Sequence, residues 1–257
     1  MIEIKTPGEI ASMRKASRVV ARTLERLREL VRPGVTTAEL NAFAEKEIRG
    51  AGAEPAFLGY RGYPATLCVS INEEIVHGIP SEKRVVREGD LVSLDLGALC
   101  EGFYGDAALT VGAGNISGGA RKLLAVAERS LELALEQVRP GARLGDVSSA
   151  VERFAVQNGM SVVREFAGHG IGRRLHEEPS IPNFGKPGTG PVLKAGMTLA
   201  IEPMLCLGRA EIIVRNDGWT AVSADGSLAA HCEHTVAVTE DGCEILSSSG
   251  EKAGGLL

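Results

Sequence analysis

An internal repeat constrains the fold of this chain more than any other feature. The tetrapeptide Val-Arg-Pro-Gly at 31–34 recurs at 138–141, a shift of 107 residues. The same shift carries the segment VVREG at 85–89 onto a similar segment, and it places Asp95 on Glu202. Similarity at one fixed spacing indicates a duplicated structural unit. We therefore predict two similar halves related by a pseudo-twofold axis, with the two carboxylates near that axis.

Each copy of the repeat has the pattern of two helices followed by strands. Thr6 can cap a first helix with Glu9 three residues later, and Thr36 with Glu39 repeats this capping box at a second helix. Apolar runs rich in β-branched residues predict the strands. We expect these strands at about 66–71, 91–96, 105–111, 197–202 and 232–238.

Length and composition indicate one domain. A chain of 257 residues with 44% hydrophobic residues can form a single large core, and no segment has the composition of a linker. We expect one catalytic domain over 1–248. The tail at 249–257 is too poor in apolar residues to pack, so we expect it to be flexible.

Charge and cysteine content indicate a cytoplasmic protein. The formal net charge of -5 gives no reason to expect a membrane partner or a sequence-specific nucleic-acid partner. Five cysteines without a C-x-x-C pair, in a chain that begins with a charged segment instead of a signal peptide, favour reduced thiols in the cytosol. No run of about 18 apolar residues is present to span a bilayer.

Four acidic residues stand in segments that otherwise suit buried strands. Asp95 lies in LVSLDLG, and Asp106 follows a glycine-containing turn, so both can point into one cavity from a hairpin. Glu202 ends an apolar run before a proline, and Glu233 starts another run. Buried charges require a partner. Each acid taken alone could pair with Arg or Lys, but four together indicate bound cations.

A histidine flanked by glycines completes this set of candidate ligands. His169 lies in the segment AGHGIG. One imidazole with four carboxylates suits divalent ions such as Mn, Fe or Co and differs from a thiolate zinc site. Because carboxylates can bridge, we predict two metal ions about 3.5–4 Å apart.

At this point the sequence resembles the type I methionine aminopeptidases, which have the pita-bread fold, over nearly its whole length to about Leu246. The resemblance implies an α+β fold of two pseudo-twofold-related halves around a central antiparallel sheet. The motifs that carry it are HGIP at 77–80, DLG at 95–97, GD at 105–106, GHGIG at 168–172 with His176-Glu177, IEP at 201–203 and EHT at 233–235.

The resemblance also implies a role for each candidate ligand. Asp95, Asp106 and Glu233 would hold one metal ion, and Asp106, His169, Glu202 and Glu233 would hold the other. Such a pair of ions lowers the pKa of a shared water molecule and polarises the scissile carbonyl. Glu202 would accept the proton of the water through its second oxygen.

Two further histidines and a set of aromatic residues would contact the substrate. The resemblance implies that His176 donates a hydrogen bond to the developing oxyanion and that His77 contacts the peptide nitrogen. The substrate's amine would approach the metal held by Asp95. Aromatic walls and a thiol suit the flexible thioether of methionine. The remaining pocket residues would be Phe57, Tyr60, Tyr63, Cys68 and Trp219, each of which ordinary core packing could also explain.

Two positions depart from the family pattern. Leu175 stands where an aromatic residue is common, which leaves the width of the methionine pocket open. His231 stands where Gln is common, on the same strand face as Glu233, and could act on the metal as a neighbour of its ligands. The spacing of 33 residues between His169 and Glu202 leaves no room for the insertion of type II relatives, and no zinc-finger extension is expected.

The resulting hypothesis is removal of methionine from nascent proteins whose second residue is small. One alternative is an Xaa-Pro aminopeptidase or prolidase, which shares the fold and the metal ligands but usually carries an additional N-terminal domain. Another is a non-catalytic pita-bread binding protein, although such relatives lose metal ligands. We expect a monomer, peptides with N-terminal Met as partners, and transient proximity to the ribosome as a further hypothesis.

Overall fold

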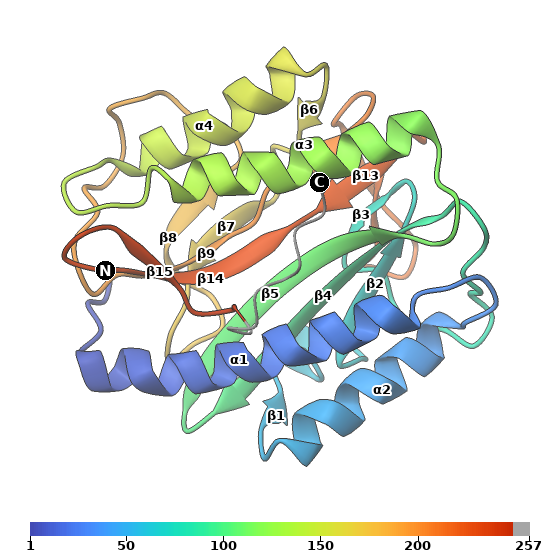
Figure 1. Ribbon diagram of the computed structural model, residues 1–257, viewed down its shortest axis with the longest axis horizontal. Coiled ribbons are helices and arrows are strands. Elements are labelled where there is room, and N and C mark those ends of the chain that lie inside the picture. The colour runs from blue at the N-terminus through green and yellow to red at the C-terminus, as the bar shows by residue number, and fades with distance from the viewer. Residues whose placement is uncertain (249–257) are drawn as a thin grey trace.

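The computed structural model describes residues 1–248, so the tail predicted at 249–257 lies outside the described residues. Figure 1 shows two pairs of helices, one from each half of the chain, lying across a long sheet. None of the helices within 1–248 combines the length and apolar character needed to cross a membrane. The helices are α1 (Pro7–Leu30), α2 (Thr37–Gly50), α3 (Gly118–Leu135) and α4 (Leu144–Gln157), with a short 3-10 helix, η1, at Tyr60–Gly62.

The helices of the first half begin at the predicted capping boxes. The Thr6 hydroxyl accepts a hydrogen bond from the Glu9 N–H at 3.3 Å, and the Thr6 N–H donates to the Glu9 carboxylate at 2.7 Å. Thr36 and Glu39 form the same pair of bonds at the start of α2. These bonds satisfy backbone N–H groups that a helix start otherwise leaves without partners.

The central sheet is antiparallel and extends through both halves. Its strands follow the order β1-β4-β5-β14-β9-β7-β8, with β2 paired to β4 and β15 paired to β14. The pairing of β5 with β14 joins the two halves. The strand bounds are β1 (Glu54–Pro55), β2 (Leu67–Ile71), β4 (Leu91–Cys100), β5 (Phe103–Gly112), β7 (Ala167–Gly170), β8 (Glu177–Pro182), β9 (Thr198–Ile201), β14 (Glu233–Val238) and β15 (Cys243–Ile245).

Two smaller antiparallel sheets flank the central one. One has the order β13-β10-β6 and the other β11-β12-β3. Their strands are β3 (Glu74–Val76), β6 (Ser161–Val162), β10 (Met204–Cys206), β11 (Ile212–Val214), β12 (Ala221–Ser223) and β13 (Ala229–His231).

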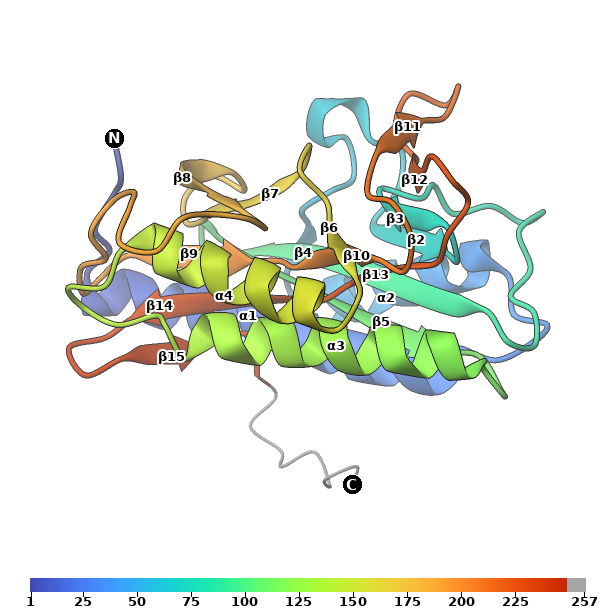
Figure 2. The ribbon, with the colours of Figure 1, turned by 90° about the horizontal axis from the view of Figure 1, so that it is seen from above.

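The two faces of the central sheet differ in what covers them. Figure 2 shows α1 and α3 on one side, whereas the loops around η1, β8 and β11 lie on the other. Alternation along β4 matches this arrangement: Val92, Leu94 and Leu96 belong to a buried apolar cluster with residues of α1 and α2. Residues of opposite parity, which include Asp95, therefore point to the face without helices.

The fold confirms the expected α+β pita-bread architecture, and elements of its halves correspond under the same shift. Helix α2 moved by 107 residues coincides with α4 at both ends. An isolated bridge joins Thr36 to Val85 in the first half, and the corresponding bridge joins Arg143 to Val192 in the second. In both halves, the second residue after the Pro-Gly segment between the two helices is therefore bridged to the corresponding position further along the chain.

Candidate metal centre

Strand register brings the candidate ligands to one face of the central sheet. Asp95 lies opposite Ala108 and Gly97 lies opposite Asp106 in the β4–β5 hairpin, so both aspartates share a face. Glu233 of β14 also lies opposite Ala108. Residues of one parity in paired strands project together. Asp95, Asp106 and Glu233 therefore converge because their strands are antiparallel and in register.

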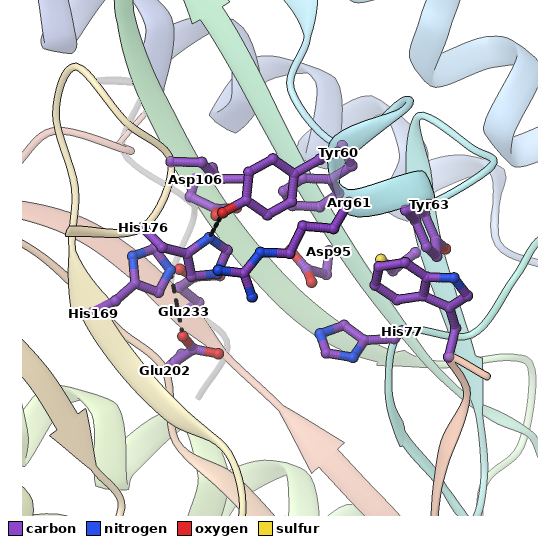
Figure 3. Close-up of a pocket in the computed structure, with 14 residues that line it drawn as sticks. Tyr60, Arg61, Tyr63, His77, Asp95, Asp106, His169, His176, Glu202 and Glu233 are labelled. Carbon is purple, nitrogen blue, oxygen red and sulfur yellow. Dashed lines mark hydrogen bonds and ion pairs between the residues drawn. The ribbon is translucent and has the colours of Figure 1, made fainter. Parts of the chain in front are cut away.

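The second half supplies the other two ligands in the same way. Glu202 follows β9 directly, one position beyond the pairing of Ile201 with His234, and so comes beside Glu233. His169 of β7 lies opposite Ala200, which has the same parity as Glu202. Figure 3 shows the carboxylates of both halves and His169 directed into one pocket.

Glycines on both sides of His169 allow β7 to lie close to its neighbours. A Cβ atom at Gly168 would come within 2.5 Å of the Ala200 carbonyl oxygen, and one at Gly170 within 2.1 Å of the Glu178 carbonyl oxygen. Any side chain at these positions would push the strands apart. The glycines therefore set the depth at which the imidazole enters the site.

A threonine two residues beyond Glu233 holds the backbone of Asp106. The Thr235 hydroxyl accepts a hydrogen bond from the Asp106 N–H at 3.0 Å and donates to the Asp106 carbonyl at 2.7 Å. Both residues are buried. Thr235 therefore fixes the carboxylate of Asp106 relative to β14, a link that the EHT motif alone does not reveal.

The distances within the site suit metal coordination. Potential ligand atoms of Asp106, His169 and Glu233 all lie within 4.8 Å of one another, and so do those of Glu202, His231 and Glu233. Asp95 belongs to neither group. One carboxylate oxygen each of Asp95, Asp106 and Glu233 is buried without a hydrogen-bond partner. Because buried charged oxygens require compensation, these orphaned atoms fit bound cations.

Burial changes the acidity of this cluster. It raises the pKa of Asp95 and of Glu202 to about 7. Burial and the neighbouring acids raise the pKa of Asp106 and Glu233 well above the ordinary range. Neighbouring like charges and low polarity both favour the protonated form, whereas a divalent ion favours the carboxylate. The chain by itself therefore lacks the positive charge that this site needs.

Two histidines stand on opposite sides of the ligands. The His176 ring stacks on Tyr60, and its Nδ1 lies 2.9 Å from the Tyr60 hydroxyl. Its centroid is 4.1 Å from that of His169. Burial lowers the pKa of His77 to about 4, so this ring is neutral near pH 7. Both rings can donate one N–H to a substrate without carrying charge.

An apolar wall closes the other end of the pocket. Cys68 lies opposite Asp95 in the β2–β4 pairing, so its thiol faces the site. Tyr63 contacts Trp219 edge-on at 5.1 Å, and its hydroxyl donates to the carbonyls of Leu67 and Gly78. Asp217 holds the turn of Trp219 by accepting its backbone N–H at 2.9 Å. Hydrogen bonds from the protein therefore hold the Tyr63 ring and the backbone of Trp219 in this wall.

The structure places every candidate site residue in this one pocket. It also adds Arg61 and Leu175 to the lining. Sequence reasoning missed Arg61, whose only signal was its place between Tyr60 and Tyr63. Its side chain reaches across the pocket towards His176 (Figure 3). Leu175, the position that left the width of the methionine pocket open, lies in the wall of the pocket. The candidate residues found there are Phe57, Tyr60, Tyr63, Cys68, His77, Asp95, Asp106, His169, His176, Glu202, Trp219 and Glu233.

The fold and this ligand set together define a metal-dependent hydrolase of the pita-bread type. Residues 11–240 match the model of metallopeptidase family M24, and the chain belongs to this family. It is 49% identical to the methionine aminopeptidase of Clostridium perfringens, over 96% of this chain and 99% of that one. It is 48% identical to methionine aminopeptidase 1 of Bacillus subtilis, with the same coverage.

Solved structures give the same assignment of the fold. The methionine aminopeptidase of Thermotoga maritima aligns with a TM-score of 0.96 at 48% identity, covering 96% of this chain and all of that one. The prolidase of Pyrococcus furiosus aligns with a TM-score of 0.76 at 26% identity, covering 95% of this chain but only 65% of the prolidase. The chain therefore shares its fold with both groups and its length with the first.

Proposed function

We propose that this protein is a methionine aminopeptidase, which hydrolyses the first peptide bond of chains that begin with methionine. One observation carries the proposal: a pocket with five metal-ligand side chains at one end has an aromatic and thiol wall at the other. Relatives that carry this activity in their names match the chain from end to end. A flexible thioether fits such a wall through contacts worth about 0.3–1.5 kcal/mol each.

We propose that the site takes two divalent ions, which Asp106 and Glu233 would hold together with Asp95 at one end of the cluster and with His169 and Glu202 at the other. When bound, the pair would lower the pKa of a water molecule and polarise the scissile carbonyl. Oxygen-rich ligation with one imidazole suits Co, Mn or Fe.

The remaining roles belong to the side chains of this protein. Glu202 holds the site with one oxygen and can accept a proton with the other. His176, which is stacked and oriented by Tyr60, donates a hydrogen bond to the oxyanion. His77 contacts the peptide nitrogen on the leaving side. The Asp95 end receives the free α-amine, and this restricts hydrolysis to the first residue. Small second residues such as Gly, Ala and Ser are accepted.

The decisive experiment compares peptides on metal-free protein reconstituted with Co²⁺ or Mn²⁺. We expect turnover of Met-Ala-Ser, no turnover of its N-acetylated form, and little of Ala-Pro-Ala. A preference for the Xaa-Pro peptide would replace this proposal with a prolidase-like activity. If reconstituted protein leaves all three peptides intact and Asp106→Ala retains its metal content, the chain is a binding protein.

Finer aspects of this proposal concern where the protein works. We propose a cytoplasmic monomer that meets nascent chains near the ribosome. Light scattering of the purified protein tests the monomer, with a mass of 27.0 kDa as the expected result. Sedimentation with ribosomes tests the proximity to the ribosome. If the protein stays entirely in the supernatant at low salt, the proposed proximity to the ribosome is wrong, and the rest of the proposal is unaffected.

A further inference from the structure

A buried imidazole beside the metal ligands has no role in the proposed mechanism. His231, at the end of β13, is 1% exposed, and neither ring nitrogen has a hydrogen-bond partner. A buried polar group without a partner costs about 1–3 kcal/mol. Among the residues that the structure describes, His231 is the one such histidine. One of its ring nitrogens lies within 4.8 Å of ligand atoms of Glu202 and Glu233, so the ring borders the site.

The backbone of His231 is fixed by the first half of the chain. The His231 N–H donates to the Thr110 hydroxyl at 3.0 Å, and the hydroxyl donates in turn to the His231 carbonyl at 2.7 Å. The Ser93 hydroxyl lies 2.7 Å from the same oxygen of Thr110. This network fixes the main chain from which the buried imidazole extends.

The two oxygens of Glu202 face different histidines. Oε1 lies 3.7 Å from His169 Nε2, which is a separation expected for two ligands of one ion. Oε2 lies 3.3 Å from His231 Nε2. With His169 on one side and His231 on the other, Oε1 faces the cation site and Oε2 faces the imidazole, and Oε2 keeps a second lone pair that can accept the proton of the water.

We propose that His231 is a positioning residue that donates its Nε2–H to Glu202 Oε2 and thereby holds Oε1 towards the metal. A small rotation of the ring aligns the N–H, since the two atoms are already near hydrogen-bond distance. The inference rests on the metal-binding part of the proposed function and not on its substrate. Substituting a residue that is hydrogen-bonded to a metal ligand typically lowers metal affinity about 10–100-fold.

Two substitutions separate a hydrogen-bond donor from a merely space-filling side chain. His231→Gln keeps an N–H donor of similar reach, whereas His231→Leu keeps volume and loses the donor. The matched control is His234→Leu, because His234 lies three residues further along the chain, on β14, and its Nδ1 lies 2.9 Å from the Ser247 hydroxyl on the face opposite to Glu233. Thermal unfolding of each metal-free variant reports whether the fold is retained.

The readout is Co²⁺ affinity, measured by competition with a chelator, together with the visible absorption of bound Co²⁺. We expect His231→Leu to bind Co²⁺ about 10–100-fold more weakly with a changed spectrum. His231→Gln should stay within about threefold of the original protein and keep its spectrum, and His234→Leu should do the same.

Two results would overturn the inference. If His231→Leu binds Co²⁺ as tightly as the original protein, His231 does not position Glu202. If His231→Gln is as weak as His231→Leu, the imidazole itself is required, as it would be for a direct ligand. Both results are independent of peptide turnover. A protein that binds Co²⁺ as described but leaves Met-Ala-Ser intact would refute the proposed activity and leave this inference standing.

Discussion

The two halves of this molecule have closely corresponding frames but contribute to the site differently. Both present a long helix, a Pro-Gly break, a 14-residue helix and a strand in or directly after which an acid of the site stands. The first half places two aspartates on a hairpin of two 10-residue strands. The second places its three candidate ligands on or beside strands of four to six residues. The frame is common to both halves, whereas most of the chemistry is not.

This difference shows where new function is added to a repeated unit. Asp95 and Glu202 correspond under the 107-residue shift, but the positions equivalent to Asp106 and Glu233 are Ile213 and Val126. We infer that a duplicated scaffold supplied one acid from each half and that the other ligands were added separately. Strands at the centre of a sheet can accept such acids because one face carries no helix.

The largest effect should come from substituting the corresponding acids. Asp95→Asn and Glu202→Gln keep the volume of each side chain but remove its charge. We expect both variants to lose metal affinity and turnover by more than about 100-fold, which exceeds the effect of removing an outer partner. At saturating Co²⁺, turnover of Met-Ala-Ser should recover further in Asp95→Asn, because Glu202 also accepts a proton. If turnover recovers equally in both variants, Glu202 has no role as a proton acceptor beyond the role that it shares with Asp95.

The next largest effect should come from substituting Lys5, which forms a buried ion pair with Glu177. The 107-residue shift does not repeat this pair. Lys5 Nζ lies 2.7 Å from the Glu177 carboxylate, and both side chains are 3% exposed. Glu177 also accepts the Arg174 N–H, so the pair holds the loop that presents His176. We expect Lys5→Met to lower the free energy of unfolding by about 3–5 kcal/mol, because it leaves a buried charge unpaired.

Lys15 provides the matched control for this pair. It lies 2.6 Å from Glu101, but the two side chains are 58% and 48% exposed. Lys15→Met should therefore lower the free energy of unfolding much less than Lys5→Met does, because an exposed ion pair is screened by water. Chemical denaturation measures both variants. Equal costs would mean that Glu177 is compensated by groups other than Lys5.

How far the sequence predicts this molecule differs between its frame and its pocket. Helix starts at Thr6 and Thr36 and the strand around Asp95 follow from local signals, since capping and alternation act within a few residues. The ligands could be chosen because an acid in an apolar strand is costly and therefore informative. The place of Arg61 could not, since its loop has no periodicity and only tertiary packing sets its direction.

Pairings between distant strands also lie beyond the sequence. Nothing near Asp106 indicates that Thr235 holds its backbone, or that Lys5 reaches Glu177. Such contacts depend on strand order, which sequence periodicity does not encode. The resemblance to a known family supplied the roles of His77 and His176, which as loop histidines would otherwise have no distinguishing signal.

The combined acidic cluster of both halves should make the metal-free protein sensitive to pH. A carboxyl group with a raised pKa in the folded state stabilises the fold below its unfolded pKa and loses that contribution as the pH rises through its folded pKa. Histidines with lowered pKa, such as His77, oppose this below about pH 6.5. Above that pH only the acids remain. For Asp95 and Glu202 the loss extends through about pH 7.

We therefore expect the melting temperature in chelator to fall between pH 6.5 and 8. With Co²⁺ bound it should be constant or rise, because the ion replaces the protons. Glu202→Gln should reduce the slope of the metal-free protein. A melting temperature in chelator that stays level or rises over this range would show that the cluster is not protonated in the fold.

The smallest effect should come from the helix starts that correspond under the shift. Thr36 accepts the Glu39 N–H through its hydroxyl at 3.1 Å, whereas Arg143 at the equivalent position has no acceptor atom in its side chain. Its backbone N–H still donates to Asp146 at 2.9 Å. Thr36→Ala should cost about 1 kcal/mol, and Arg143→Ala should stay within about 0.5 kcal/mol.

The reciprocal substitution sharpens this comparison. Arg143→Thr places a hydroxyl where the first half has one, so it should stabilise α4 by up to about 1 kcal/mol in chemical denaturation. The gain depends on the backbone at 143 being extended, as it is at Thr36, and the two positions have ψ values of 148° and 150°. If Arg143→Thr gives no gain, the bond from its side chain to the Gly190 carbonyl at 2.9 Å already compensates for the missing cap. The two helix starts would then be equally stable although different side-chain bonds hold them.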